Sequence, residues 1–351
     1  MNKDNKSIIY LDRNENQYGP APACFEVLNN INPIELYEYS RDFSRGVKSR
    51  LTERLASDFG LDEKNVMVGF GGEDILKQAV HCYIHKGDKI MIPAYSWWYY
   101  KKISDEVEGI KVEYPIVEGK DSFYYDIEGM LKVYEEHKPK LVLISSPNNP
   151  TGNRLELDQL KYVLEKMKDT HVVLDEAYTL FYNKDNSHLK ELVKQYPNLI
   201  IIRTFSKYYG LAGIRIGFAL MGENHATFNM FAARYLGYNR VSELIGLAAL
   251  DSADYYNEMR EKMTSDMEMF YNEFDNMPGF RPFKSYSNFI LVEIPAEIKD
   301  GLKKYLTERH MIVKFMAEDG LFNHLRITIG TKEQNRLLMD MIKTYLIENK
   351  K

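Results

Sequence analysis

The sequence predicts an α/β protein in which a large, mostly parallel sheet is followed by a smaller α+β domain. Through the middle of the chain, short apolar runs alternate with amphipathic stretches, which is typical of β-α units. Several runs show little alternation of polar and apolar residues, as expected for parallel strands covered on both faces. The expected strands of the large sheet are residues 65–70, 88–92, 110–117, 141–145, 171–174, 199–202 and 214–221.

Helical spacing fills the intervals between these strands. Apolar residues recur at steps of four from Val47 to Phe59, and Gly60 follows as a stop signal. A helical pattern over residues 242–276 is long enough to bridge two domains. After Pro282 the composition changes. The patterns there predict strands at residues 288–294 and 324–329 and helices at residues 298–308 and 331–347.

The chain is therefore expected to divide into three parts. Residues 1–45 form an N-terminal arm and part of the small domain. Residues 46–245 form the large domain, which binds the cofactor argued for below. Residues 246–351 form the small C-terminal α+β domain.

The composition excludes several classes of protein. The 351 residues carry 46 basic and 51 acidic side chains, so the net charge of −5 provides no basic surface for nucleic acid or membrane. No run approaches the ~18 apolar residues of a membrane helix. Cys24 and Cys82 form no CxxC motif, and the polar N-terminus has no apolar signal core, which together favour the cytoplasm. His81 and His85 flank Cys82, but no further ligand completes a set, so we expect no metal site.

Polar residues gather where the predicted strands end, which is where open α/β sheets bind ligands. GFGGED lacks the last glycine of a dinucleotide fingerprint and the Gly-Lys of a Walker A loop. Alone it is a glycine turn, but its place between a strand and a helix favours a phosphate cradle. The informative segments are GFGGED (69–74), SPNNPTG (146–152), VVLDEAY (172–178), RTFSKYYGLAGIRIGF (203–218) and HLRITIG (324–330).

The residue types in these segments suit pyridoxal phosphate. Lys207 follows a strand, and a lysine forms the Schiff base to the cofactor aldehyde. Asp175 ends an apolar strand, where an acid is costly to bury without a cationic partner, and a carboxylate can keep the pyridine nitrogen protonated. Arg215, eight residues after Lys207, suits the phosphate.

With these motifs in order, the sequence resembles the fold-type-I pyridoxal-phosphate aminotransferases, and among them the histidinol-phosphate aminotransferase branch. The resemblance runs from LDRNENQYGP (11–20) to LRITIGT (325–331). It implies that Lys207 is the Schiff-base lysine and proton shuttle, that Asp175 pairs with the pyridine nitrogen, and that Tyr178 and Asn149 bond the ring hydroxyl. The phosphate would be held by Gly72 and Glu73 through backbone amides and by Thr204, Ser206 and Arg215.

The resemblance also assigns the ring face, the substrate and the partner subunit. Tyr95 would stack on the ring, although WWYY follows it and a core position is the alternative; Trp97 and Trp98 are expected to pack or to form pocket wall. Arg326 would bind the substrate carboxylate. Asn16 and Tyr18 would line the substrate pocket, and Tyr39 would reach the phosphate of the partner in a homodimer with composite active sites.

Two positions depart from the family pattern. Tyr39 is followed by Ser40 where the family has proline. The branch carries a second arginine, before the carboxylate-binding one, that grips the substrate phosphate, and here the nearest cation is Lys314. A lysine meets a phosphate as a point charge rather than as a planar fork, and the alternative is a solvated lysine.

The leading function is that of a transaminase, which transfers nitrogen from an amino donor, expected to be glutamate, to a 2-oxo acid or a phosphorylated ketone. One alternative is a decarboxylase or lyase acting on a small phosphorylated amino acid, since the sequence does not show which substrate bond is broken. A non-catalytic regulator is disfavoured because no basic helix-turn-helix pattern precedes the core, and a nicotinamide oxidoreductase because the glycine fingerprint is incomplete.

Overall fold

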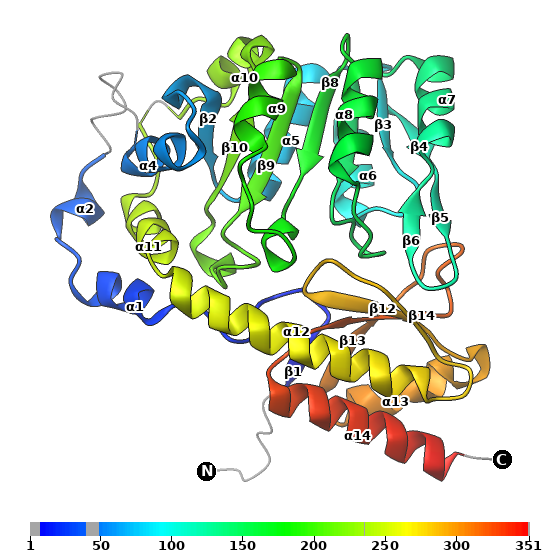
Figure 1. Cartoon of the computed structure of the whole chain (residues 1–351). Helices are drawn as coiled ribbons and strands as arrows, with labels where there is room; N and C mark the ends of the chain where they lie inside the picture. Colours follow the sequence, from blue (N-terminus) through cyan, green and yellow to red (C-terminus); the bar gives the residue numbers. More distant parts are fainter. Residues whose placement is uncertain (1–7, 40–48, 235, 350–351) are drawn as a thin grey trace.

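The computed structural model describes residues 8–39, 49–234 and 236–349. Its large sheet has seven strands, parallel except for β10, which is antiparallel to both of its neighbours. The carboxyl ends of the six parallel strands therefore lie along one edge (Figure 1). In spatial order the strands are β2 (Val66–Gly69), β10 (Gly217–Met221), β9 (Leu199–Thr204), β8 (His171–Asp175), β7 (Leu141–Ser145), β3 (Lys89–Pro93) and β4 (Ile110–Tyr114).

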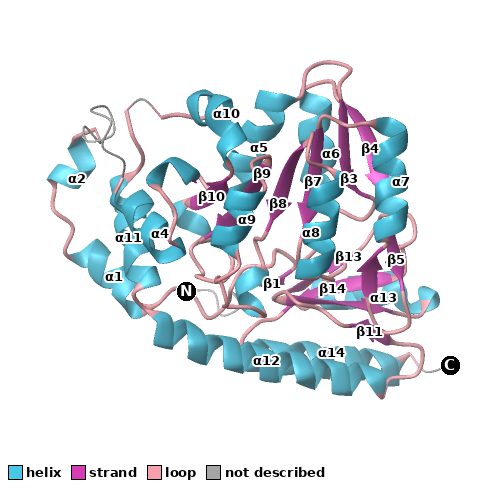
Figure 2. Cartoon of the chain, turned by 45° about the horizontal axis from the view of Figure 1, so that its top comes forward, coloured by secondary structure: helices cyan, strands magenta, loops and turns pink. Residues whose placement is uncertain are grey.

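Helices cover both faces of this sheet, which explains the apolar runs of the sequence (Figure 2). Val172 and Leu174 point into one apolar cluster, and Val173 between them points into the other. The parallel sheet buried on both faces is thus confirmed. One layer contains α5 (Gly72–Tyr83), α6 (Trp98–Glu106) and α10 (Ala226–Phe231), and the other contains α4 (Arg50–Phe59), α7 (Ile127–His137), α8 (Leu157–Lys166) and α9 (Leu189–Gln195).

A second sheet of five strands joins the two ends of the chain. Its first strand, from the N-terminal arm, pairs in parallel with a strand some three hundred residues later. In spatial order the strands are β1 (Ile9–Leu11), β13 (Met311–Phe315), β14 (His324–Thr328), β12 (Phe289–Glu293) and β11 (Arg281–Phe283), with helices α13 (Lys299–Glu308) and α14 (Lys332–Glu348). Helix α12 (Ala253–Asp275) runs from the large sheet to this smaller one (Figure 1).

Several elements differ from the sequence expectations. The strand expected over residues 110–117 is interrupted at Pro115, which has no N–H to give to the ladder, and continues as β5 (Ile116–Glu118) in a hairpin with β6 (Phe123–Tyr125). The strand expected from residue 214 begins at Gly217, because Arg215 has a left-handed backbone with φ of 51°. The single helix over 242–276 is two, α11 (Arg240–Leu250) and α12.

The remaining helices lie in the N-terminal arm. They are α1 (Pro22–Asn29) and α2 (Ile34–Tyr37). Ser49 caps α4, whose predicted beginning at Val47 lies outside the described residues. Among the described helices, none is long and apolar enough to cross a membrane. The expected division of the chain at residues 45 and 245 stays a prediction.

A buried histidine cluster lies at the amino end of β8, away from the polar sheet edge. His225 is 1% exposed, and its Nδ1 lies 2.7 Å from the Tyr83 hydroxyl. The Tyr83 ring stacks on His171 with centroids 3.8 Å apart. Burial, and after it the nearby His171, lower the pKa of His225 to about 4.

We therefore expect stability to fall as the pH drops. Above pH ~6.5 His225 is neutral in both states, whereas between pH ~6.5 and ~4 only the unfolded chain takes up the proton. This lowering of the His225 pKa, by about 2.5 pH units, corresponds to a loss of about 3 kcal/mol in the free energy of unfolding between pH ~6.5 and ~4. In urea unfolding, the free energy of unfolding of His225→Gln should fall less between pH 7 and pH 4 than that of the unsubstituted protein. His85→Gln, at an exposed position, serves as the control; equal pH dependence in all three proteins would contradict the assignment.

Candidate active site

A cavity of about 490 Å³ opens at the carboxyl edge of the large sheet and is closed on its other side by β13, β14 and the N-terminal arm. Segments far apart in sequence therefore contribute one wall each. The structure brings together most of the residues that the sequence predicts for the site. Those lining the cavity are Gly72, Glu73, Asn149, Asp175, Tyr178, Thr204, Ser206, Lys207, Arg215, Lys314 and Arg326.

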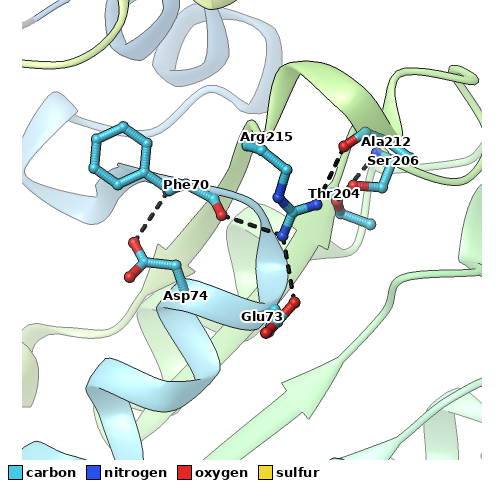
Figure 3. Close-up of polar contacts among 7 residues, drawn as sticks. All are labelled: Phe70, Glu73, Asp74, Thr204, Ser206, Ala212 and Arg215. Carbon is cyan, nitrogen blue, oxygen red and sulfur yellow. Dashed lines mark hydrogen bonds and ion pairs between the residues drawn. The ribbon is translucent and has the colours of Figure 1, made fainter.

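One end of the cavity is built to hold an anion. Gly72 and Glu73 are the first two residues of α5, a twelve-residue helix whose N-terminal amides and dipole favour negative charge. Arg215 reaches over this end, with its guanidinium 3.5 Å from the Phe70 carbonyl and 3.4 Å from the Glu73 carboxylate (Figure 3). The left-handed φ of Arg215 turns its side chain back toward the helix.

Two further features complete this end of the cavity. Ser206 donates its backbone N–H to the Thr204 hydroxyl at 3.1 Å, so both hydroxyls lie at the end of β9 (Figure 3). Gly71 has φ of 86°, and a Cβ there would lie 2.9 Å from Arg215 Nη2. A side chain at Gly71 would displace the guanidinium, so the glycine keeps room for it.

Asp175 supplies the negative group at the centre of the cavity. It is the last residue of β8, where the Ala177 N–H donates to Oδ1 at 3.0 Å and the Tyr100 hydroxyl to Oδ2 at 2.8 Å. Burial raises the pKa of Asp175, and the two hydrogen bonds oppose that shift. Among the described residues, no lysine, arginine or histidine forms an ion pair with it. A cation supplied by a ligand would relieve the cost of holding this half-buried carboxylate.

Lys207 lies just after β9, the strand next to β8. Its Nζ donates to the Arg13 carbonyl at 3.1 Å and lies 5.8 Å from the centroid of the Tyr178 ring. No ion pair within the described ranges holds its ammonium group, so the amine is available to a ligand. Asn14 donates its side-chain amide to the Tyr178 hydroxyl at 3.0 Å and so fixes the phenol beside this lysine.

Two cations share the wall formed by the small sheet. Lys314 on β13 and Arg326 on β14 are cross-strand partners, so their side chains project from the same face. Arg326 is buried and donates to the Asp12 carbonyl at 2.6 Å and to the Asn149 side-chain oxygen. Its Nε is buried without a hydrogen-bond partner in the described part of the chain.

Four predicted residues do not line the cavity. Tyr95 packs edge-on against Phe123, and its hydroxyl lies beside Gly320. The Asn16 amide donates to the Tyr208 carbonyl at 2.9 Å, and the Tyr18 hydroxyl lies 3.2 Å from Asp266 on α12. These contacts tie the arm to the large sheet and to α12, which corrects the expectation that Asn16 and Tyr18 line the pocket. Tyr39 is 67% exposed and is absent from the cavity of its own chain.

Sequence reasoning missed other residues of the cavity wall. The arm contributes Asp12 to Glu15, directly before the predicted Asn16, and Asn14 has a left-handed φ of 54°. That strain is supported by hydrogen bonds of Asn14 with Thr328, Asn288 and Tyr178. Ser96 and Glu318, which follows β13, were also missed. Trp97 and Trp98, expected to pack or to form pocket wall, line the cavity in the place expected of Tyr95. The polar DRNEN segment was the available signal for the arm.

No three histidine, cysteine, aspartate or glutamate side chains of the described residues are grouped so as to hold a metal ion. His81 Nε2 lies instead 3.3 Å from Glu106 Oε2.

The polar atoms of the cavity fit pyridoxal phosphate. The anion-binding end suits its phosphate, unpaired Asp175 suits its ring nitrogen, and Lys207 suits its aldehyde.

The fold and this set of residues define a pyridoxal-phosphate-dependent enzyme of fold type I. The chain belongs to the aminotransferase class I and II family, whose model matches residues 6–342. It is 32% identical to histidinol-phosphate aminotransferase 1, chloroplastic, of Arabidopsis thaliana over 97% of this chain and 79% of that protein. It is 30% identical to histidinol-phosphate aminotransferase 2 of Archaeoglobus fulgidus over 96% and 93%.

A solved structure has the same fold. It is histidinol-phosphate aminotransferase from Sinorhizobium meliloti in complex with pyridoxal-5'-phosphate, with a TM-score of 0.86 and 24% identity over 96% of this chain and 90% of that one. This structure confirms the expected fold, and the family match confirms the expected enzyme class and its cofactor.

Proposed function

We propose that this aminotransferase takes an amino group from glutamate and gives it to a phosphorylated ketone or 2-oxo acid, as the names of its histidinol-phosphate aminotransferase relatives suggest. The observation that carries the substrate class is the cross-strand pair of Lys314 and Arg326 on one wall of the cavity. One cation suits the α-carboxylate of glutamate, and the other suits the distal phosphate or acid of the acceptor that occupies the same cavity in the second half-reaction.

The cofactor, when bound, supplies an electron sink for the bond broken at the substrate α-carbon. Lys207 provides the amine that attaches to the cofactor aldehyde, and then moves a proton at the α-carbon. Asp175 holds the proton on the ring nitrogen. Tyr178 and Asn149 bind the ring hydroxyl, and their positions beside Lys207 and Arg326 support this role.

The phosphate of the cofactor is assigned to the α5 end of the cavity. The amides of Gly72 and Glu73, the hydroxyls of Thr204 and Ser206, and Arg215 hold it there. Trp98, which is 58% exposed at the start of α6 and lines the cavity, takes over the ring-covering role expected of Tyr95.

The substrate is held by the small sheet and not by the arm residues Asn16 and Tyr18. Arg326 binds the α-carboxylate of glutamate and of the 2-oxo acid formed from it, where its planar guanidinium suits two oxygens. Lys314, exposed to the cavity, binds the distal phosphate or acid of the acceptor.

We also infer a two-fold dimer with composite active sites. Helices α1 and α2 lie beyond α11 at one side of the molecule (Figure 1) and leave large apolar side chains in solvent. Arg240 links to Glu35 at 3.3 Å and to the Tyr39 carbonyl at 3.2 Å, which holds Tyr39 at this surface for a partner's phosphate. The exposed apolar residues of α1 and α2 are Phe25, Leu28, Ile34, Leu36 and Tyr37.

The two free thiols favour a reducing, cytoplasmic setting.

Lys207 can be tested by chemical labelling. Borohydride reduction of the holoenzyme followed by peptide mapping should place the pyridoxyl group on Lys207, because this amine lines the cavity beside Tyr178 and forms no ion pair with a described residue. Lys207→Ala should lose the label and the turnover while keeping its melting temperature. A label on another lysine in the unsubstituted protein would contradict the assignment.

The two small-sheet cations should affect different half-reactions. Arg326→Ala should lower kcat/KM for glutamate by roughly 30-fold to several thousand-fold, since losing a buried charged partner costs about 2–5 kcal/mol. Lys314→Ala should lower kcat/KM for histidinol phosphate and leave the glutamate half-reaction nearly unchanged. That half-reaction also separates transamination from decarboxylation, because only a transaminase converts its cofactor stoichiometrically to the pyridoxamine form.

Lys304→Ala is the matched control, because this lysine is exposed on α13 and absent from the cavity wall. Equal slowing of both half-reactions by Lys314→Ala, or of neither, would remove Lys314 from phosphate binding. An unphosphorylated, aromatic acceptor would then be the better substrate.

The composite site predicts complementation between inactive chains. Mixing Tyr39→Phe with Lys207→Ala chains should form heterodimers with one intact site, and hence more activity than either parent. Sedimentation should give a dimer in every case. A fully active monomer in solution would rule out the shared site.

A further inference from the structure

We propose that Tyr100 is a positioning residue for the cofactor: its phenol holds the Asp175 carboxylate anionic and aimed into the cavity. The inference rests on the proposed role of Asp175 at the ring nitrogen. Tyr100 touches no substrate, so it would act only through this carboxylate. The notable feature is that a tyrosine inside the helix layer, and not a residue of the cavity wall, sets the charge of the acid.

The geometry leaves Tyr100 little freedom. It lies in the first turn of α6 and is 1% exposed, packed with apolar residues of the sheet. Its hydroxyl donates to Asp175 Oδ2 at 2.8 Å, while the Ala177 N–H donates to Oδ1 at 3.0 Å. One donor on each oxygen fixes the plane of the carboxylate and leaves its remaining lone pairs for a ligand.

The groups around Tyr100 and Asp175 determine which of the two carries the proton in their hydrogen bond. Burial raises the pKa of Asp175, Glu176 adds to that shift, and the Tyr100 and Ala177 hydrogen bonds and Lys207 oppose it. Burial raises the pKa of Tyr100 well above its usual range, and Asp175 adds to the shift; Ser145 opposes it, and Tyr114 is a further small cause. The phenol therefore stays protonated and acts as a donor over the working pH range.

A buried tyrosine needs some acceptor, so the hydrogen bond alone could be structural. Tyr114 provides the matched case. It is also fully buried, and its hydroxyl donates to the Leu143 carbonyl at 3.0 Å. Loss of either hydroxyl removes one buried hydrogen bond, but only Tyr100 bonds to the carboxylate. Hydrogen bonds to a charged acceptor are the stronger class.

Cofactor affinity is the first readout. The chain has two tryptophans, Trp97 and Trp98, and both line the cavity, so their fluorescence reports binding of pyridoxal phosphate to the apoprotein. Tyr100→Phe should weaken binding roughly tenfold, and Tyr114→Phe less than about threefold. In an Asp175→Asn background, Tyr100→Phe should weaken cofactor binding further by less than about twofold, because the two residues act as one unit.

The second readout is the proton on the ring nitrogen. With ¹⁵N-labelled pyridoxal phosphate, the nitrogen shift at neutral pH should move toward the unprotonated value in Tyr100→Phe and stay unchanged in Tyr114→Phe. The reason is that loss of the donor makes the carboxylate more basic, which draws the proton toward it. A purely structural tyrosine would not move this shift.

Thermal melting of both apoproteins controls for folding. If Tyr100→Phe unfolds, 3-fluorotyrosine incorporated at position 100 keeps the ring, and its more acidic phenol should tighten binding. Equal behaviour of Tyr100→Phe and Tyr114→Phe, or an unchanged nitrogen shift, would overturn the role of Tyr100 while Asp175→Asn still impairs binding. If Asp175→Asn leaves affinity and shift unchanged, the proposed role of Asp175 fails as well.

Discussion

A carboxylate at the end of a buried strand is the constraint on which the site depends. β8 is central in the large sheet and covered on both faces, so Asp175 reaches the surface only at the cavity. A charge held there without a cation of the protein costs free energy, and a cationic ligand bound beside it would offset that cost. The neighbouring strands β7 and β9 end at the same edge and deliver Asn149 and Lys207 to it.

The small sheet closes this edge because it combines the first strand of the chain with strands from the C-terminal part. β1 pairs with β13, and so the arm that follows β1 runs along the cavity, where Asp12 accepts from Arg326 and Asn14 reaches Tyr178. Asn14 therefore contacts the small sheet through Thr328 and the segment that follows β8 through Tyr178. Asn14 is thus one of the direct links between the two parts, beside the hydrogen bond from Arg326 to Asn149.

The sequence predicted the parts of the fold that follow from local pattern. Apolar runs predicted β7 and β8 to within a residue, and the turns after strands predicted Lys207, Asp175 and Arg215 at the cavity. It could not predict β1, whose three residues pair with a strand at the other end of the chain. The antiparallel direction of β10 is likewise a non-local choice that no periodicity records.

The direction of side chains was the second feature that the sequence could not predict. In AYSWW five residues offer three aromatic rings, and only packing decides which ring faces the cavity. Tyr95 is held away by Phe123 and by the loop at Gly320, which leaves the wall to Trp97 and Trp98. Asn16 and Tyr18 looked polar and close to the motif, but each is satisfied by a partner outside the cavity.

The pair of adjacent acids in DEAY shows how the fold resolves such a choice. Successive residues at a strand end point to opposite sides, so Asp175 and Glu176 cannot both face the cavity. Glu176 is buried against Arg203, with Nη2 to Oε2 at 2.7 Å, and the same guanidinium donates to Asn186 at 2.7 Å. Arg203 neutralises one acid inside the protein and leaves the other without a cation. The unpaired acid is the one whose charge a cationic ligand would neutralise. That difference between the two acids, more than their presence, supports the proposed role of Asp175 at the cofactor ring nitrogen.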